Sequence, residues 1–199
     1  QKAGNDVRLR SEWSPAAGTH AIVKVSAVVS FSENVTKVTI GRLADAVREL
    51  AYSHDLDKEG PINAITMAIG PASPPPVTQE NAGVVFHKMR GALSAEALSV
   101  VPDGIRFESS SYTRWVAFEK QVSEYLEVLL PVAAQSATIK SLALEYIDLF
   151  VAQQEGDADA TLVVDRKSDL IARASFKKLE PFHSHCGWFE PINATFRRL

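Results

Sequence analysis

The segment FHSHCGWFEP, residues 182–191, brings together residue types that can do chemistry. It holds His183 and His185, two of the five histidines, and Cys186, the single cysteine of the chain. Imidazole and thiolate groups are the ligands that zinc prefers, and a thiolate next to a base can act as a nucleophile. The segment could therefore be a metal site, a nucleophile site or an aromatic strand.

Alternation along a strand decides which of these side chains can act together. In an extended segment His183 and His185 lie on one face, where they could share one divalent ion with a carboxylate from a neighbouring strand. Candidate carboxylates are Glu145, Asp148 and Glu190. The metal candidates are thus His183, His185 and Glu145. Because metal sites use three or four ligands and the spacing supplies two, we favour histidines that make hydrogen bonds on a sheet face, and we expect no cofactor.

The same alternation turns Cys186 away from the histidines and toward Phe182 and Trp188. Burial among such side chains raises the pKa of a thiol, whereas a nucleophile needs a lowered one. Breaking the strand at Gly187 would be required to bring the cysteine to the histidines, and glycine permits such a bulge. We interpret Cys186 as a small core side chain.

Sequence templates of common enzymes are absent from the rest of the chain. It has no phosphate-binding glycine loop, nucleophile elbow, zinc-protease helix or kinase signature. Glu145 and Asp148 fall on opposite faces of their strand and cannot form an acid–base pair. The aromatic stripe Trp115, Phe118 and Tyr125 is more typical of a helix core than of a ligand platform. The sequence favours a protein that is not an enzyme without deciding the question.

The overall composition is that of an ordinary globular protein. The 199 residues are 46% hydrophobic and 23% charged, and the formal net charge is −3. This net charge provides no positive field that would attract nucleic acid. Nucleic-acid binding is supported only by scattered basic residues such as Lys177, Lys178, Arg197 and Arg198. A single cysteine and a polar N-terminal stretch favour the cytoplasm over an oxidising compartment or a membrane.

Hydrophobic periodicity predicts the elements that must position these residues. Residues 21–31 alternate as a half-buried strand, and residues 39–53 form a helix capped by Thr39. PINAITMAI is a strand, and residues 84–109 form an antiparallel meander with a tight PDG turn. A second helix spans residues 111–131 and stops at Pro131.

The last third of the chain predicts further strands. Residues 138–152 are apolar on both faces, which is typical of a central strand covered by layers on each side. TLVVD is a short strand and SDLIARASF a short helix. The order of elements predicts an α+β fold with a mostly antiparallel twisted sheet and two main helices. We expect a flexible arm over 1–20 and a single domain over 21–199 with a proline-rich loop at 71–83.

Three segments in order, GIRFESSSYTRWVAF, LALEYIDLF and FHSHCGWFEP, resemble a sporadically distributed prokaryotic family of uncharacterised proteins. The resemblance covers residues 104–191 and implies a bacterial or archaeal protein, with no reaction, cofactor or catalytic residue attached to it. Lys24 departs from the acidic residue expected in that family. Similar proteins continue beyond the position of Leu199, so we expect the fold to be truncated there.

These observations favour a non-enzymatic binding or assembly module of a cytoplasmic prokaryotic protein. Such a module would use a sheet face or edge to form a homo-oligomer or to bind a protein partner. The alternative is an enzyme or sensor that holds a metal or small ligand near His183, His185 and a carboxylate.

Overall fold

The computed structural model describes residues 13–67, 77–152, 189–192 and 195–198. Contacts divide the chain into two compact units, one of residues 24–145 and one of residues 1–23 with 146–199. The single domain over 21–199 stays a prediction. The predicted strand TLVVD, the predicted helix SDLIARASF and residues 182–188 lie outside the described residues.

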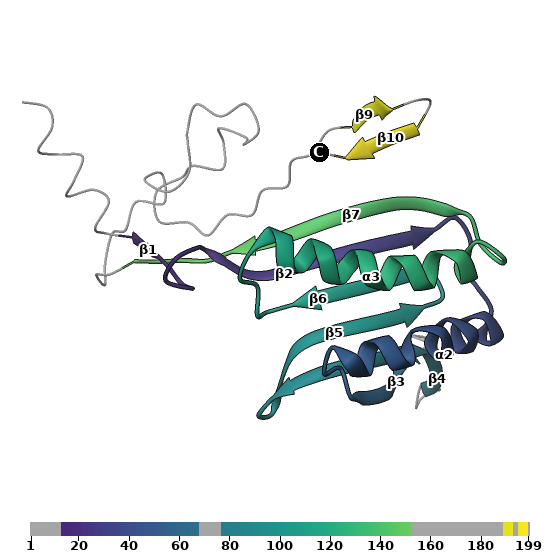
Figure 1. Cartoon of the computed structure of the whole chain (residues 1–199). Helices are drawn as coiled ribbons and strands as arrows, with labels where there is room; N and C mark the ends of the chain where they lie inside the picture. The colour runs from purple at the N-terminus through teal and green to yellow at the C-terminus, as the bar shows by residue number, and fades with distance from the viewer. Residues whose placement is uncertain (1–12, 68–76, 153–188, 193–194, 199) are drawn as a thin grey trace, which may run out of the picture. The chain divides into compact units, whose positions relative to one another are not determined.

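A six-stranded sheet covered by two helices on one face forms the main unit (Figure 1). The strand order is β3 (Lys58–Met67), β4 (Val77–Arg90), β5 (Leu93–Val101), β6 (Gly104–Ser109), β2 (Ile22–Phe31) and β7 (Ile139–Asp148). The helices are α2 (Lys37–Ser53) and α3 (Trp115–Ala133). The α+β class with an antiparallel sheet and two helices is therefore confirmed, and β4, β5 and β6 form the predicted meander.

Helix α2 forms because its apolar residues recur on one face. Six of its residues are buried: Thr39, Ile40, Leu43, Ala44, Val47 and Ala51. The helix begins earlier than predicted, since Thr36 is its N-cap and accepts a hydrogen bond of 3.2 Å from the Thr39 N–H. The turn gained in this way is mostly exposed, since Lys37 and Val38 are exposed and Thr39 is buried.

Helix α3 has the apolar stripe that its sequence predicts, but it does not stop at Pro131. The helix continues through Pro131 to Ala133, which is fully buried. Proline lacks only its own N–H bond, and close to the end of a helix the backbone distortion that it causes affects few turns. Burial of Ala133 offsets that loss.

The hydrophobic core lies between the helices and the sheet. Side chains that alternate along β2, among them Val25, Ala27 and Val29, face the helices and are buried. Phe107 of β6 packs between Phe118 and Tyr125 of α3, with ring centroids 5.6 Å and 5.2 Å away. Phe118 and Tyr125 of the aromatic stripe are thus core residues, as their spacing indicated, whereas Trp115 at the start of α3 is exposed.

Two further boundaries differ from the sequence prediction. The loop predicted at 71–83 is too long, because residues 77–83 already belong to β4. Part of the predicted arm is a strand, β1 (Trp13–Pro15), which pairs with β8 (Phe150–Ala152). In the same unit β9 (Phe189–Ile192) pairs with β10 (Thr195–Arg198) as an antiparallel hairpin.

Neither described helix combines the length and the apolar composition that crossing a membrane requires.

Candidate functional site

Strand β7 is the outermost strand on one side of the six-stranded sheet. This position corrects the prediction of a central strand covered on both faces. The error has a physical cause, because apolar residues on both faces indicate that a strand is covered but do not tell what covers it. Within the described residues β7 pairs with β2 on one side and leaves its other edge open.

The side chains of β7 are unusually apolar for an exposed edge. Leu142 and Leu144 share one face and are 53% and 46% exposed, while Ile139 on the other face is 41% exposed. The edge has the backbone donors and acceptors of a strand without a neighbour on that side. Apolar side chains and unpaired backbone groups together make β7 a template for an additional strand.

The opposite edge of the sheet carries features that discourage such pairing. β3 contains Pro61, which has no N–H to donate, and its register with β4 shifts between Ile62 and Asn63. Charged residues occur in both edge strands, Lys58 and Glu59 in β3 and Lys140, Glu145 and Asp148 in β7, so charge does not distinguish the two edges. Proline, bulges and charges are the usual protection of an edge strand. β7 has neither proline nor glycine, so the two edges are not equivalent.

A hollow of about 530 Å³ lies on the sheet, lined by residues of β2, β3, β4, β5 and β6. Side chains such as Val28, Ser99 and Arg106 line it, and they alternate with the buried ones that face the helices. Arg106 and Glu108 line the hollow and lie close to each other, and Glu108 also pairs with Lys24, which is not part of the lining. Lys24 Nζ lies 2.9 Å from Glu108 Oε1, and Arg106 Nη1 lies 3.6 Å from the same oxygen. These cations are engaged with a protein carboxylate, which weakens the case for an anion site.

A polar cluster joins the two helices at the C-terminal end of α2. His54 Nε2 lies 2.9 Å from Glu124 Oε2, and the His54 ring packs edge-on against Tyr125. The Gln121 side-chain amide donates to the Tyr125 hydroxyl at 3.1 Å and to Glu96 at 3.2 Å. Each of these groups has a partner within the cluster, as is typical of a structural network that positions helices.

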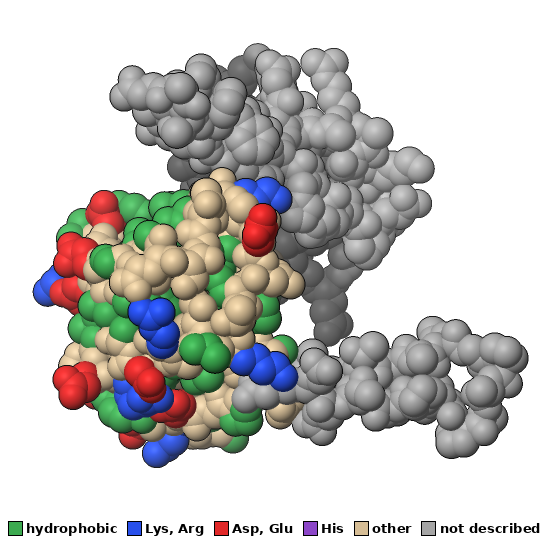
Figure 2. Space-filling model, turned by 90° about the vertical axis from the view of Figure 1, so that its right-hand side faces the viewer, with side chains coloured by type: hydrophobic (Ala, Val, Ile, Leu, Met, Phe, Trp, Pro, Cys, Tyr) green, Lys and Arg blue, Asp and Glu red, His purple; other side chains and the backbone are tan. Residues whose placement is uncertain are grey.

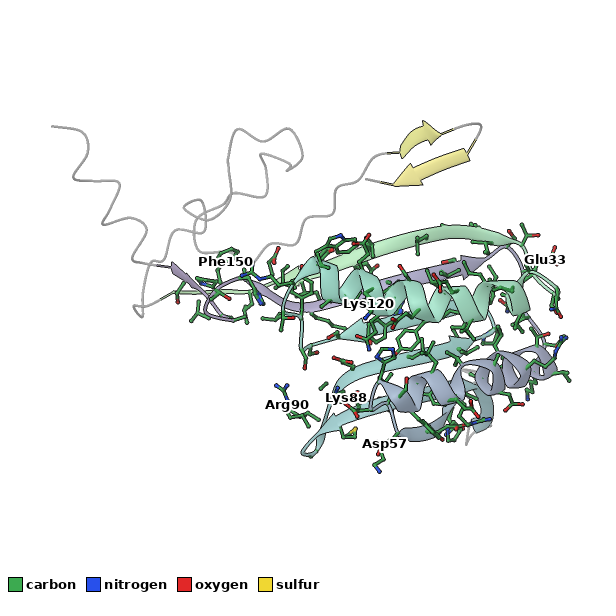
Figure 3. The ribbon with its side chains drawn as sticks, in the orientation of Figure 1. Glu33, Asp57, Lys88, Arg90, Lys120 and Phe150 are labelled. Carbon is green, nitrogen blue, oxygen red and sulfur yellow. The ribbon has the colours of Figure 1, made fainter. Side chains whose placement is uncertain are left out.

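Charge on the visible surface is mixed. Figure 2 shows acidic and basic side chains scattered among hydrophobic and other side chains on the described part of one face. Lys88, which lies near the C-terminal end of α2 in Figure 3, pairs with Asp55 at 3.0 Å. A surface of interspersed charges has no extended field of one sign to attract a polyanion.

The sequence-predicted site residues are only partly described. Glu145 lies on β7 and is exposed, whereas His183, His185 and Cys186 lie outside the described residues. Glu190 lies on β9, opposite Arg197 of β10. In the described ranges no group of three or more histidine, cysteine, aspartate or glutamate residues could hold a metal ion. The metal hypothesis therefore stays a prediction.

Comparisons with models of known protein families, with curated proteins and with solved structures each gave no match. The candidate site consequently rests on the geometry of this chain. Sequence reasoning identified the apolar character of β7 but not its edge position. No local signal marks that position, because a strand without proline and glycine, such as β7, is equally typical of the centre of a sheet.

Proposed function

We propose that this chain is a non-enzymatic binding or assembly module whose binding surface is the open edge of β7. A strand added there would complete the backbone hydrogen bonds of the edge and cover the apolar side chains on both of its faces. The observation that carries the proposal is the exposure of Leu142 and Leu144 on the outermost strand of the described sheet. The cytoplasmic prokaryotic setting, and membership in the family that the sequence resembles, belong to the same proposal.

The contrast between the two edges supports this assignment. An exposed apolar edge strand is an aggregation hazard, and a chain that protects β3 with a proline and a bulge has the means to protect β7 as well. The apolar, unbroken sequence of β7 is better explained by a specific neighbour than by chance exposure.

Site-specific photocrosslinking tests the proposal. A photoreactive amino acid replaces Ser141 of β7 in one variant and Asn63 of β3 in a control, and both are irradiated as purified protein and in the cells that express them. We expect a discrete adduct from position 141, its loss when Leu142→Lys and Leu144→Lys are added, and none from position 63. Equal labelling at both positions, or no adduct at position 141, would contradict the proposal.

A further inference from the structure

We infer that the strand added to β7 is the β7 strand of a second copy of this chain, paired antiparallel about a twofold axis at Ala143. The inference rests on the proposed function, because it names the partner of the same edge. It starts from the sequence of β7 (Ile139–Asp148), which is IKSLALEYID.

The apolar pattern of β7 is a palindrome centred on Ala143. Leu142 and Leu144 flank the centre, and Ile139 and Ile147 lie four residues to either side of it. A twofold axis perpendicular to a continuous sheet pairs residues that lie at equal distances before and after the axis. Pairs related in this way point to the same face of the sheet, as cross-strand neighbours must.

Each pair in this register joins compatible side chains. Leu142 of each copy faces Leu144 of the other, so that four leucines cluster on one face. In the separate chains these side chains are about half exposed. On the other face Ala143 faces its own copy, and Ser141 faces Glu145, a hydrogen-bonding pair. Lys140 faces Tyr146, so that neither end of the pairing opposes like charges.

The pairing also suits the backbone. If the N–H and C=O of a residue point to the open edge, those of its symmetry-related partner point to the same edge of the second copy. The two residues therefore face each other and can exchange backbone hydrogen bonds. The pairing would unite two sheets into one and remove both open β7 edges at once. An isologous contact of this kind closes on itself, so it forms a dimer and no filament.

Two double variants that remove the same apolar side chains test the register. In Leu142→Lys with Leu144→Lys, each lysine would face a lysine of the second copy. In Leu142→Lys with Leu144→Glu, each lysine would face a glutamate. Because both positions are exposed in the chain, both variants are expected to fold, and thermal unfolding followed by circular dichroism checks this.

Sedimentation velocity over a concentration series gives the outcome. We expect the wild type to dimerise and the Lys/Lys variant to be monomeric. The Lys/Glu variant should dimerise at least about tenfold more tightly than Lys/Lys, since opposite charges replace like charges in both symmetric pairs. Val116→Lys, which removes an exposed apolar side chain from α3, is the control and should dimerise as the wild type does.

The possible failures are distinguishable. Equal dimerisation of the Lys/Lys and Lys/Glu variants overturns the register. Equal loss of the dimer in both variants overturns it too. A parallel pairing would produce that loss, because it places position 142 of one copy opposite position 142 of the other. A monomeric wild type whose position 141 still forms a specific adduct of a different mass overturns the second copy as partner. In that last case the β7 edge keeps its proposed function with another partner.

Discussion

Gly104 lies so close to Val29 that a Cβ atom built on Gly104 would come within 3.0 Å of the Val29 backbone oxygen. The two residues belong to paired strands, and Gly104 lies opposite Ser30 in the register of β6 and β2. Gly104 follows the Pro102–Asp103 turn, whose carbonyls accept hydrogen bonds of 2.8 Å from the N–H groups of Val35 and Phe31. The absence of a side chain lets this turn pack directly onto the end of β2.

Gly104→Ala is therefore expected to lower the free energy of unfolding by more than about 1 kcal/mol, because backbone must move to make room for the methyl group. Gly41→Ala is the matched control. Gly41 lies in α2, where a Cβ atom would have no atom within 4 Å other than those of its chain neighbours and of the backbone of its own helix, and alanine there should stabilise the protein by about 0.5–1 kcal/mol. Chemical denaturation of both variants measures the difference, and similar effects at the two positions would disprove the close-contact role of Gly104.

Asp55, which follows the C-cap of α2, lies in the left-handed region, with a φ of 63°. The Leu56 N–H donates to the Ala51 carbonyl at 2.9 Å, which closes the helix end in the manner of a Schellman motif. We expect Asp55→Ala to destabilise the protein by about 1 kcal/mol relative to Asp55→Gly, since glycine adopts this φ without strain.

Both Asp55 variants lose the same ion pair with Lys88, an exposed contact that contributes little. The comparison between alanine and glycine therefore isolates the backbone contribution. Thermal unfolding of the two variants under identical conditions provides the measurement, and equal midpoints would show that the positive φ carries no cost.

Local patterns allowed much of the fold to be predicted. The alternation of β2 and the stripes of α2 and α3 depend on which side of each element is buried. The polarity of each residue along the element indicates that side. The ends were less predictable. Thr36 and Thr39 are both plausible caps, and Pro131 is a plausible stop. Burial of Ala133 favours the longer α3, whereas the first turn of α2 is mostly exposed and depends on the cap itself.

The candidate site was harder to predict because it depends on strand order. The residues of β7 indicate a covered strand, but its neighbours follow from pairing with β2, which lies more than 100 residues earlier in the chain. Local periodicity contains no information about that pairing. The reactive residues His183 and His185 attracted attention by their types, whereas the β7 edge becomes visible only once the sheet is assembled.

The pKa of Glu59 is lowered chiefly by hydrogen bonds from Arg48, whose Nε lies 2.8 Å from its carboxylate, and further by the Tyr52 hydroxyl, while burial opposes the shift. A lowered pKa in the folded state means that the interaction stabilises the protein above the ordinary glutamate pKa of about 4.3. This stability is lost as the pH falls through the folded-state value.

Glu59→Gln should therefore destabilise the protein at pH 7 and make its stability less dependent on pH below about 4.3. Glu119→Gln removes the same charge from an exposed position of α3 and serves as the control. Denaturant titrations at several acidic pH values provide the comparison. Parallel curves for the wild type and Glu59→Gln would contradict the role of this carboxylate.

Tyr125 is 1% exposed, and burial is the main cause that raises its pKa to about 12. The carboxylates of Glu96 and Glu124 add to the shift, while the hydrogen bond with Gln121 opposes it. An unfolded tyrosine ionises near 10, so between about 10 and 12 the unfolded chain releases a proton that the folded protein retains. The stability linked to Tyr125 is thus fully present below pH 10 and is lost as the pH rises through this window.

Tyr125→Phe is expected to lower the stability by about 1 kcal/mol at pH 7, because the Gln121 amide loses one of its acceptors. The variant should also weaken the dependence of unfolding on pH above about 10, since phenylalanine has no proton to release. Tyr112→Phe is the comparison, as Tyr112 is only partly buried. If the two variants changed the dependence of unfolding on alkaline pH equally, the burial of Tyr125 could not be the cause of that dependence.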